Sequence, residues 1–152
     1  MFFENRASCL GETYRVLRAG GRFAATCWCS LDENPGFLAL HRAIETALGS
    51  CAAETAARPF SLSESEVVAR DIAEAGFSNV TIETIAIPIF SRSVDEFANW
   101  YLFGTSVAPL ARGRADAVAS ILRNVAEDLS SYVEPDGVVL PTKAYCIWAH
   151  RR

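Results

Sequence analysis

The sequence predicts an α/β fold, and three observations carry that prediction. A helical pattern at residues 6–18 runs through a double glycine into the short apolar segment 22–28. Helical and extended patterns continue to alternate, so the order of elements along the chain is α β α α β α α β. The segment 22–28 is nearly uncharged, which is typical of a parallel strand with both faces covered.

Length, composition and charge narrow the class of protein. With 152 residues, 51% of them hydrophobic, the chain is long enough for one domain with a core, so we expect a single domain over residues 1–152. A net charge of −4 gives no broad reason to expect nucleic acid. No apolar run approaches the roughly 18 residues of a membrane span, and the start MFFE is not the basic start of a signal peptide. We therefore expect a cytoplasmic protein that binds neither nucleic acid nor membrane.

The first helix is predicted over residues 6–18. Apolar residues recur there at spacings of three and four, namely at Ala7, Leu10, Tyr14 and Leu17. Gly11 interrupts this pattern and weakens the helix by about 1 kcal/mol relative to alanine. Gly20 and Gly21 end the helix, because glycine accepts the left-handed backbone of a helix stop.

Capping signals predict the next two helices. Asn34-Pro35 combines a capping side chain with a proline in the first turn, and Gly49 stops the helix that follows. Residues 50–60 are predicted as a loop or a ragged helix end. Ser63 and Glu66 have the spacing of a capping box and are predicted to begin a third helix.

The second half of the chain is predicted to hold two long strands around a helical region. The first covers residues 80–90, and its alternation changes phase near Glu83-Thr84, which indicates a bulge. A capping box at residues 93–96 opens the next helix, and a long helix is predicted over 114–132. The last strand is predicted from 138 to 149.

Five cysteines raise the question of a metal or redox site. Cys27 and Cys29 are two residues apart and share a face of the predicted strand. The two histidines, His41 and His150, lie far away in sequence, and no CxxC pair occurs. We therefore expect buried or half-buried free thiols and no metal site.

Three phrases of the sequence carry a family resemblance. They are MFFENR at residues 1–6, YRVLRAGGR at residues 14–22, and Trp28 at the end of the first strand. Together they resemble the second half of class I S-adenosylmethionine-dependent methyltransferases, of the small-molecule kind related to ubiquinone and menaquinone biosynthesis. Weaker matches follow at residues 34–36, 75–77, 138–141 and 149–152. Ala19 departs from the proline that is usual in the family, which affects the rigidity of a turn.

The resemblance implies a partial Rossmann-like fold with the three C-terminal strands of a seven-stranded sheet. These would be the fifth, sixth and seventh strands, with the seventh inserted antiparallel between the other two. The N-terminal half, which holds the glycine-rich turn and the acidic residue that bind the cofactor, would be absent, and no GxGxG occurs in the sequence. Met1 matches a methionine that is often internal in the family, so we expect a late start or a truncated gene.

The same resemblance implies site residues. Met1, Phe2 and Phe3 match the region that borders the cofactor, S-adenosylmethionine. The residues implied for a substrate pocket are Trp28, Phe37, Trp100 and Tyr101. Core packing is the alternative interpretation for these aromatic residues. No catalytic residue is implied, because methyl transfer depends mainly on aligning an in-line displacement.

We therefore expect the C-terminal part of a methyltransferase that, when intact, transfers a methyl group from S-adenosylmethionine to an unidentified small molecule. The chain by itself would be inactive. The alternative is a non-catalytic α/β module that pairs through the open edge of the strand at residues 23–28. Its partner would be a second copy, giving a homodimer, or a separately encoded N-terminal half.

Overall fold

The structure is a computed structural model that describes residues 5–152. The chain divides into two compact units, and each is described by itself. The sheet unit comprises residues 5–30, Pro59–Ala86 and Lys143–Arg152, and the helical unit comprises Leu31–Arg58 and Ile87–Thr142. The single domain over residues 1–152 stays a prediction. None of the helices within the described residues is both long and apolar enough to cross a membrane.

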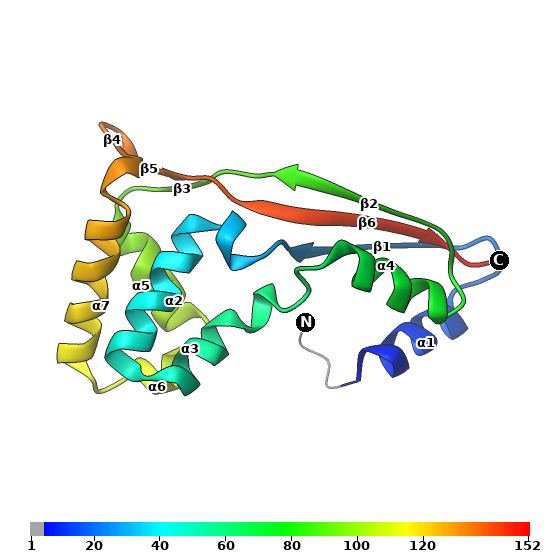
Figure 1. Ribbon diagram of the computed structural model, residues 1–152, viewed down its shortest axis with the longest axis horizontal. Helices are drawn as coiled ribbons and strands as arrows, with labels where there is room; N and C mark the ends of the chain where they lie inside the picture. Colours follow the sequence, from blue (N-terminus) through cyan, green and yellow to red (C-terminus); the bar gives the residue numbers. More distant parts are fainter. Residues whose placement is uncertain (1–4) are drawn as a thin grey trace. The chain divides into compact units, whose positions relative to one another are not determined.

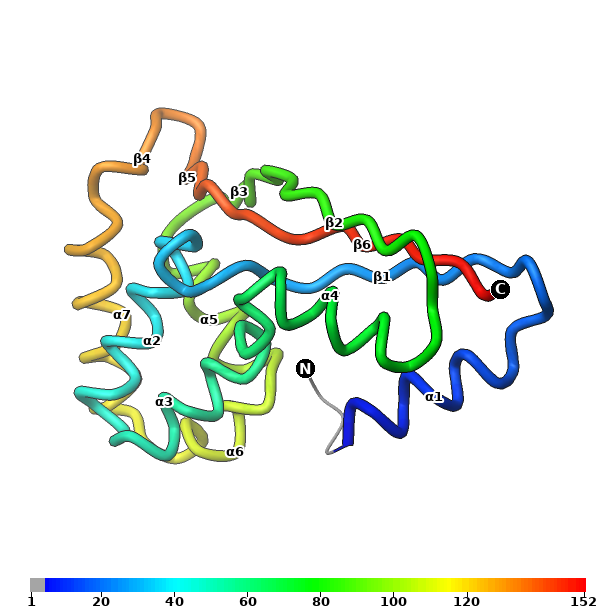
Figure 2. Tube along the Cα trace, turned by 45° about the vertical axis from the view of Figure 1, so that its right-hand side comes forward, coloured from blue at the N-terminus to red at the C-terminus, as the bar shows by residue number. Residues whose placement is uncertain are grey.

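Three strands form the sheet of the sheet unit: β1 (Arg22–Trp28), β2 (Ser78–Ala86) and β6 (Lys143–His150). β6 lies between the other two and is antiparallel to both, so β1 and β2 run parallel to each other (Figure 1). The trace in Figure 2 shows the same order. The bounds predicted for the first strand are confirmed, and so is the place of the last strand between the other two. The cover predicted on both faces of the first strand is wrong, because Arg22, Ala24 and Thr26 on one face are exposed.

Two helices, α1 (Arg6–Val16) and α4 (Ser65–Glu74), cover one face of this sheet (Figure 1). Successive side chains of a strand point to opposite faces, and the face under the helices is the apolar one. Its buried core consists of Cys27, Cys29, Val68, Ile72, Phe77, Tyr145, Ile147 and Ala149. Trp148 of the middle strand points the other way and is 41% exposed.

The first helix is shorter than predicted. It ends at Val16, because Leu17 has an extended backbone with ψ of 142°. The Arg151 side chain donates hydrogen bonds to the carbonyl oxygens of Arg15, at 2.9 Å, and of Leu17. A long-range contact therefore satisfies carbonyl groups that the end of the helix leaves without an intrahelical partner.

The capping box predicted for the third helix is wrong. α4 begins at Ser65, and its N-cap is Glu64, which makes no side-chain capping bond. The carbonyl oxygen of Ser63 instead accepts a hydrogen bond from the Tyr145 hydroxyl at 2.9 Å. Ser63 is thus joined to the sheet rather than to the first turn of the helix.

The predicted bulge near residues 83–84 is also misplaced. The register between β2 and β6 shifts between Ser78 and Thr81, and it is regular from Thr81 to Ala86. Asn79, inside the shifted stretch, has a φ of 51°. Ile85 lies on the face of β2 that points away from the helices. The apolar pattern therefore moves from one face of the strand to the other without an inserted residue.

Each of the two long strands predicted in the second half is divided in two. β2 ends at Ala86 and β3 (Ile89–Ser91) follows; β5 (Gly137–Leu140) ends before β6 begins. Pro88 and Pro141 stand at the breaks, where a residue without an N–H cannot donate to a ladder. Between the breaks, the Ile87 N–H donates to the Thr142 carbonyl at 2.9 Å. The halves consequently belong to different sheets.

Five helices and a small sheet make up the helical unit: α2 (Pro35–Leu48), α3 (Ser50–Ala57), α5 (Val94–Gly104), α6 (Ala108–Ala111) and α7 (Ala115–Asp128), with β3, β5 and β4 (Val133–Glu134). β5 lies between β3 and β4 and is antiparallel to both. The fully buried side chains of this unit include Leu40, Ile44, Leu102, Ile121, Val125 and Leu140. The bounds predicted for α2 are confirmed, and the Ser93 side chain caps α5 by accepting from the Glu96 N–H at 3.1 Å.

Two helix predictions in this unit need correction. Residues 50–57 form a regular helix, because Ala52, Ala53 and Ala56 give it a buried face of small side chains. The long helix predicted to residue 132 ends at Asp128 and gives way to a short 3₁₀ turn at Ser130–Tyr132.

Candidate functional site

The predicted site residues fall in different parts of the chain. Met1, Phe2 and Phe3 lie outside the described residues, so their contact with a cofactor stays a prediction. Trp28 is the last residue of β1, and its ring packs on Phe60 with 6.1 Å between centroids. The carboxyl ends of strands are where open α/β sheets place ligands, which suits the position predicted for Trp28.

The other three aromatic residues lie together in the helical unit. Phe37 of α2 lies 5.6 Å, between ring centroids, from both Phe97 and Tyr101 of α5. Trp100 lies 6.3 Å from Tyr101 by the same measure. Phe37 and Tyr101 are only 4% and 5% exposed, whereas Trp100 is 60% exposed. Phe37 and Tyr101 are therefore core residues, and Trp100 is the member of this aromatic cluster that solvent reaches.

The Tyr101 hydroxyl has a structural partner. It donates a hydrogen bond to the carbonyl oxygen of Ala56 at 2.5 Å. Burial raises the pKa of Tyr101 to about 12, so the phenol stays protonated at neutral pH. Tyr101 in this position holds α5 against α3 and is not poised to accept a proton.

The phrase Asn34-Pro35-Gly36 serves the packing of the helical unit. A Cβ added at Gly36 would lie 2.8 Å from the Leu140 Cδ1 and 3.2 Å from the Phe97 ring. Asn34 is fully buried at the start of α2. Close approach of α2 to these side chains explains the glycine without any ligand.

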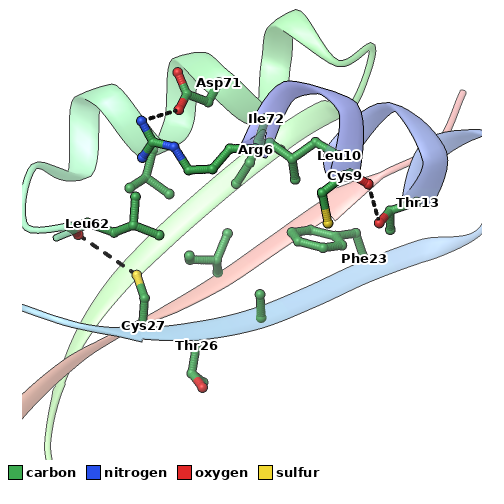
Figure 3. A pocket seen from close by; sticks show the side chains of 13 residues that line it. Arg6, Cys9, Leu10, Thr13, Phe23, Thr26, Cys27, Leu62, Asp71 and Ile72 are labelled. Carbon is green, nitrogen blue, oxygen red and sulfur yellow. Dashed lines mark hydrogen bonds and ion pairs between the residues drawn. The ribbon is translucent and has the colours of Figure 1, made fainter. Parts of the chain in front are cut away.

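A cavity lies in the sheet unit, between α1, α4 and β1 (Figure 3). Its volume is about 340 Å³. Six apolar side chains that line it are Leu10, Phe23, Leu62, Val68, Ile72 and Ile147. Sequence reasoning did not single out this site, because its walls are the same apolar stripes that predict ordinary core.

Polar and sulfur atoms lie at the edges of this cavity. The Arg6 guanidinium lies 3.4 Å from the Asp71 carboxylate, with side chains 41% and 25% exposed. The Cys27 thiol faces the carbonyl oxygen of Leu62 at 3.9 Å, and burial, together with the neighbouring Cys29, raises the pKa of this thiol. Cys27 and Cys29 are buried free thiols, as predicted. Among residues 5–152, no group of three or more His, Cys, Asp or Glu side chains is arranged to hold a metal ion.

Comparison with known proteins gives a fold and no family. No protein-family model matches the sequence, and no curated protein matches it. The chain is similar to the crystal structure of a proposed methyltransferase from Bacillus halodurans C-125, with a TM-score of 0.50 and 17% sequence identity. The match covers 98% of this chain and 59% of the Bacillus chain. At this identity the likeness shows a methyltransferase-like fold, and this chain spans little more than half the length of that protein.

Proposed function

We propose that this chain is the C-terminal part of a class I S-adenosylmethionine-dependent methyltransferase domain, whose intact form transfers a methyl group to a small molecule. The observation that carries the proposal is the strand arrangement of the sheet unit. β6 is antiparallel and separates the parallel strands β1 and β2. The family resemblance implies the same order, in which the seventh strand lies antiparallel between the fifth and the sixth.

Two further observations support the proposal. α4 lies in the chain between β1 and β2 and packs on the sheet, as the helix of a crossover between parallel strands does. The similarity to the Bacillus halodurans protein extends over 98% of this chain. The remaining part of a full domain would supply the glycine-rich turn, since no GxGxG occurs in this sequence.

The methyl transfer proposed for the intact enzyme needs little acid–base catalysis from protein side chains. The methyl group leaves a sulfonium as the acceptor atom attacks in line, so the protein's task is alignment in a dry site. We propose Met1, Phe2 and Phe3 as cofactor contacts and Trp28 as a substrate contact. The assignment of Phe37, Trp100 and Tyr101 to a substrate pocket stays a prediction, with Trp100 the most accessible of the three.

A calorimetric titration with S-adenosylmethionine tests where the cofactor site lies. We expect no measurable heat from the 152-residue chain, because the backbone cradle and the ribose-binding carboxylate belong to the part outside it. Circular dichroism and cooperative unfolding must show in the same sample that the chain is folded. Micromolar one-to-one binding would contradict the assignment of the cofactor site to another segment.

A chimera tests the function itself. The part of the Bacillus halodurans protein that this chain does not match would be joined to the 152-residue chain. The chimera is expected to bind S-adenosylmethionine, and S-adenosylhomocysteine is expected to compete for the same site. A folded chimera that binds neither cofactor nor product would refute the methyltransferase proposal.

The open edge of β1 favours a second candidate function. Within the described residues β6 is the only strand that pairs with β1, so no strand lies along the other edge of β1. A non-catalytic module would use this edge to pair with a second copy or with a separately encoded partner. Sedimentation equilibrium at high protein concentration tests the pairing of two copies, because a strict monomer excludes it and counts against the second function.

A further inference from the structure

We propose that the cavity between α1, α4 and β1 binds a small neutral molecule with an apolar ring and one hydroxyl or amide group. This proposal does not depend on the methyltransferase proposal, because it rests on the side chains that line the cavity in this chain and not on the order of the strands. Three features of the cavity carry it: its size, its apolar walls and a charge-balanced pair at its edge.

The size of the cavity indicates an occupant. The cavity is partly open to solvent, so a small molecule can enter it, and its volume is about 340 Å³. Ligand pockets commonly measure roughly 300–1,000 Å³, so this one suits a molecule of one or two rings.

The walls select an apolar body. Leu10 contributes from α1, Ile72 from α4, and Phe23 and Ile147 from the sheet, so apolar groups surround the space on three sides. The Phe23 ring offers a partner for an edge or offset contact with an aromatic ligand. The Cys27 thiol adds no charge, because burial keeps its pKa above the ordinary value. A body without charge or several polar groups therefore suits these walls.

The edge of the cavity selects the polar group. Arg6 and Asp71 lie 3.4 Å apart and together carry no net charge (Figure 3). An anionic ligand would compete with Asp71 for the guanidinium, and a cationic ligand would compete with Arg6 for the carboxylate. A hydroxyl or amide both donates and accepts, so it can bond the partly buried pair without separating it.

Nuclear magnetic resonance with two matched probes tests the proposal on the full chain. 2-Naphthol is neutral at pH 7, and 2-naphthoate has the same ring system with a negative charge. Titration with 2-naphthol is expected to shift the methyl signals of Leu10, Ile72 and Ile147 in a saturable way. We expect 2-naphthoate to bind at least tenfold more weakly. Unchanged signals from these three residues, or equal binding of the two probes, would overturn the proposal.

Two neighbouring alanines of β1 provide a variant and its matched control. Ala25 lines the cavity, whereas Ala24 points to the opposite face of the sheet. Ala25→Ile fills part of the space and is expected to weaken 2-naphthol binding at least tenfold, while Ala24→Ile leaves it within twofold. Equal binding by both variants would contradict the site. Should Ala25→Ile not fold, the methyl signals of the unmodified chain decide.

The start of the chain supplies the competing occupant. Phe2 and Phe3 precede Arg6 closely in sequence and are large enough to compete for an apolar space. The double variant Phe2→Ala/Phe3→Ala is expected to bind 2-naphthol as the unmodified chain does. If binding appears only in the double variant, the cavity belongs to the chain's own start and the proposal is wrong.

Discussion

The phenolic oxygen of Tyr101 donates a hydrogen bond to the carbonyl oxygen of Ala56 at 2.5 Å, joining α5 to the end of α3. Ala56 is the penultimate residue of α3, so its carbonyl has no partner within the helix. It is also only 3% exposed, which leaves water little access. The Tyr101 hydroxyl thus caps a buried helix end from 45 residues away in sequence.

Tyr101→Phe removes this hydrogen bond and is expected to lower the free energy of unfolding by about 1–3 kcal/mol, the cost of an unsatisfied buried acceptor. Urea unfolding followed by circular dichroism measures the change. Tyr132→Phe is the control, because Tyr132 lies in a short 3₁₀ turn and is partly exposed. A loss as large in the control would contradict the role assigned to the Ala56 carbonyl.

Because of Tyr101, we also expect the stability of the protein to depend on pH in the alkaline range. The folded chain raises the pKa of Tyr101 to about 12, above the roughly 10 of a free tyrosine, so it retains a proton that the unfolded chain loses. The stability contributed by Tyr101 is complete below pH 10 and falls as pH rises from 10 to 12. Comparing urea midpoints at pH 9 and pH 11 should show a decline that is smaller in Tyr101→Phe.

Because of Glu96, we expect the stability of the protein to depend on pH in the acidic range. Hydrogen bonds from the Arg92 side chain and backbone lower the pKa of Glu96 to about 2, and the Ser91 hydroxyl adds to this. The unfolded carboxyl has a pKa near roughly 4.3, so its stabilising effect is present above that pH and is lost as pH falls through about 2. Glu96→Gln should therefore destabilise the protein at pH 7 more than at pH 2.5. Arg92→Gln removes the main cause of the lowered pKa and should flatten the same profile.

Replacing two of the glycines by alanine is expected to change the stability of the protein in opposite directions. A Cβ at Gly11, inside α1, meets nothing within 4 Å, so Gly11→Ala should stabilise the chain by about 0.5–1 kcal/mol. Gly137 has a φ of 144°, and a Cβ there would lie 2.5 Å from the Ser91 carbonyl oxygen. Gly137→Ala should destabilise by about 1–3 kcal/mol or more from backbone strain and collision. Thermal unfolding of both variants checks the signs, and a stable Gly137→Ala would contradict the geometry.

Arg151 links α1 to the end of the chain, and replacing it is expected to lower the stability of the protein. Its guanidinium donates to the carbonyls of Arg15 and Leu17, and it lies 4.9 Å from the centre of the Tyr14 ring. Arg151→Ala should cost about 1.5–3 kcal/mol, as expected for charged hydrogen bonds. Arg152→Ala is the control, since the adjacent Arg152 is exposed. Amide hydrogen exchange should show faster opening of α1 in Arg151→Ala alone.

Local patterns predicted much of the fold because they report local geometry. The apolar segment at residues 22–28 became β1, and Asn34-Pro35 and Ser93 marked helix starts correctly. The Ser93 side chain caps its helix as predicted, whereas the Asn34 side chain makes no capping hydrogen bond. The capping box at Ser63 failed, because α4 begins at Ser65 with Glu64 at its N-cap. The Ser63 carbonyl is bonded by the distant Tyr145, a contact that no short pattern records. The place of β6 between β1 and β2 came from the family resemblance, since periodicity carries no information about strand neighbours.

The predicted site shows the same division. Three of the predicted pocket residues, Phe37, Trp100 and Tyr101, do lie together, but burial of Phe37 and Tyr101 assigns these two side chains to the core. The sequence did not indicate that Arg6 and Asp71 form a pair, because each has the pattern of an ordinary charge on a helix surface. Only the packing of α1 beside α4 brings them within 3.4 Å at the edge of a cavity.

The amino-acid sequence by itself determined the α/β class, most helices and the first strand, because helix and strand preferences act over a few neighbouring residues. The tertiary structure alone decided that two long apolar segments break at Pro88 and Pro141 and divide between two sheets. It also decided where α1, α4 and β1 leave space for a ligand. Strand pairing and cavities depend on groups far apart in sequence, and their distances are settled only when the chain is folded.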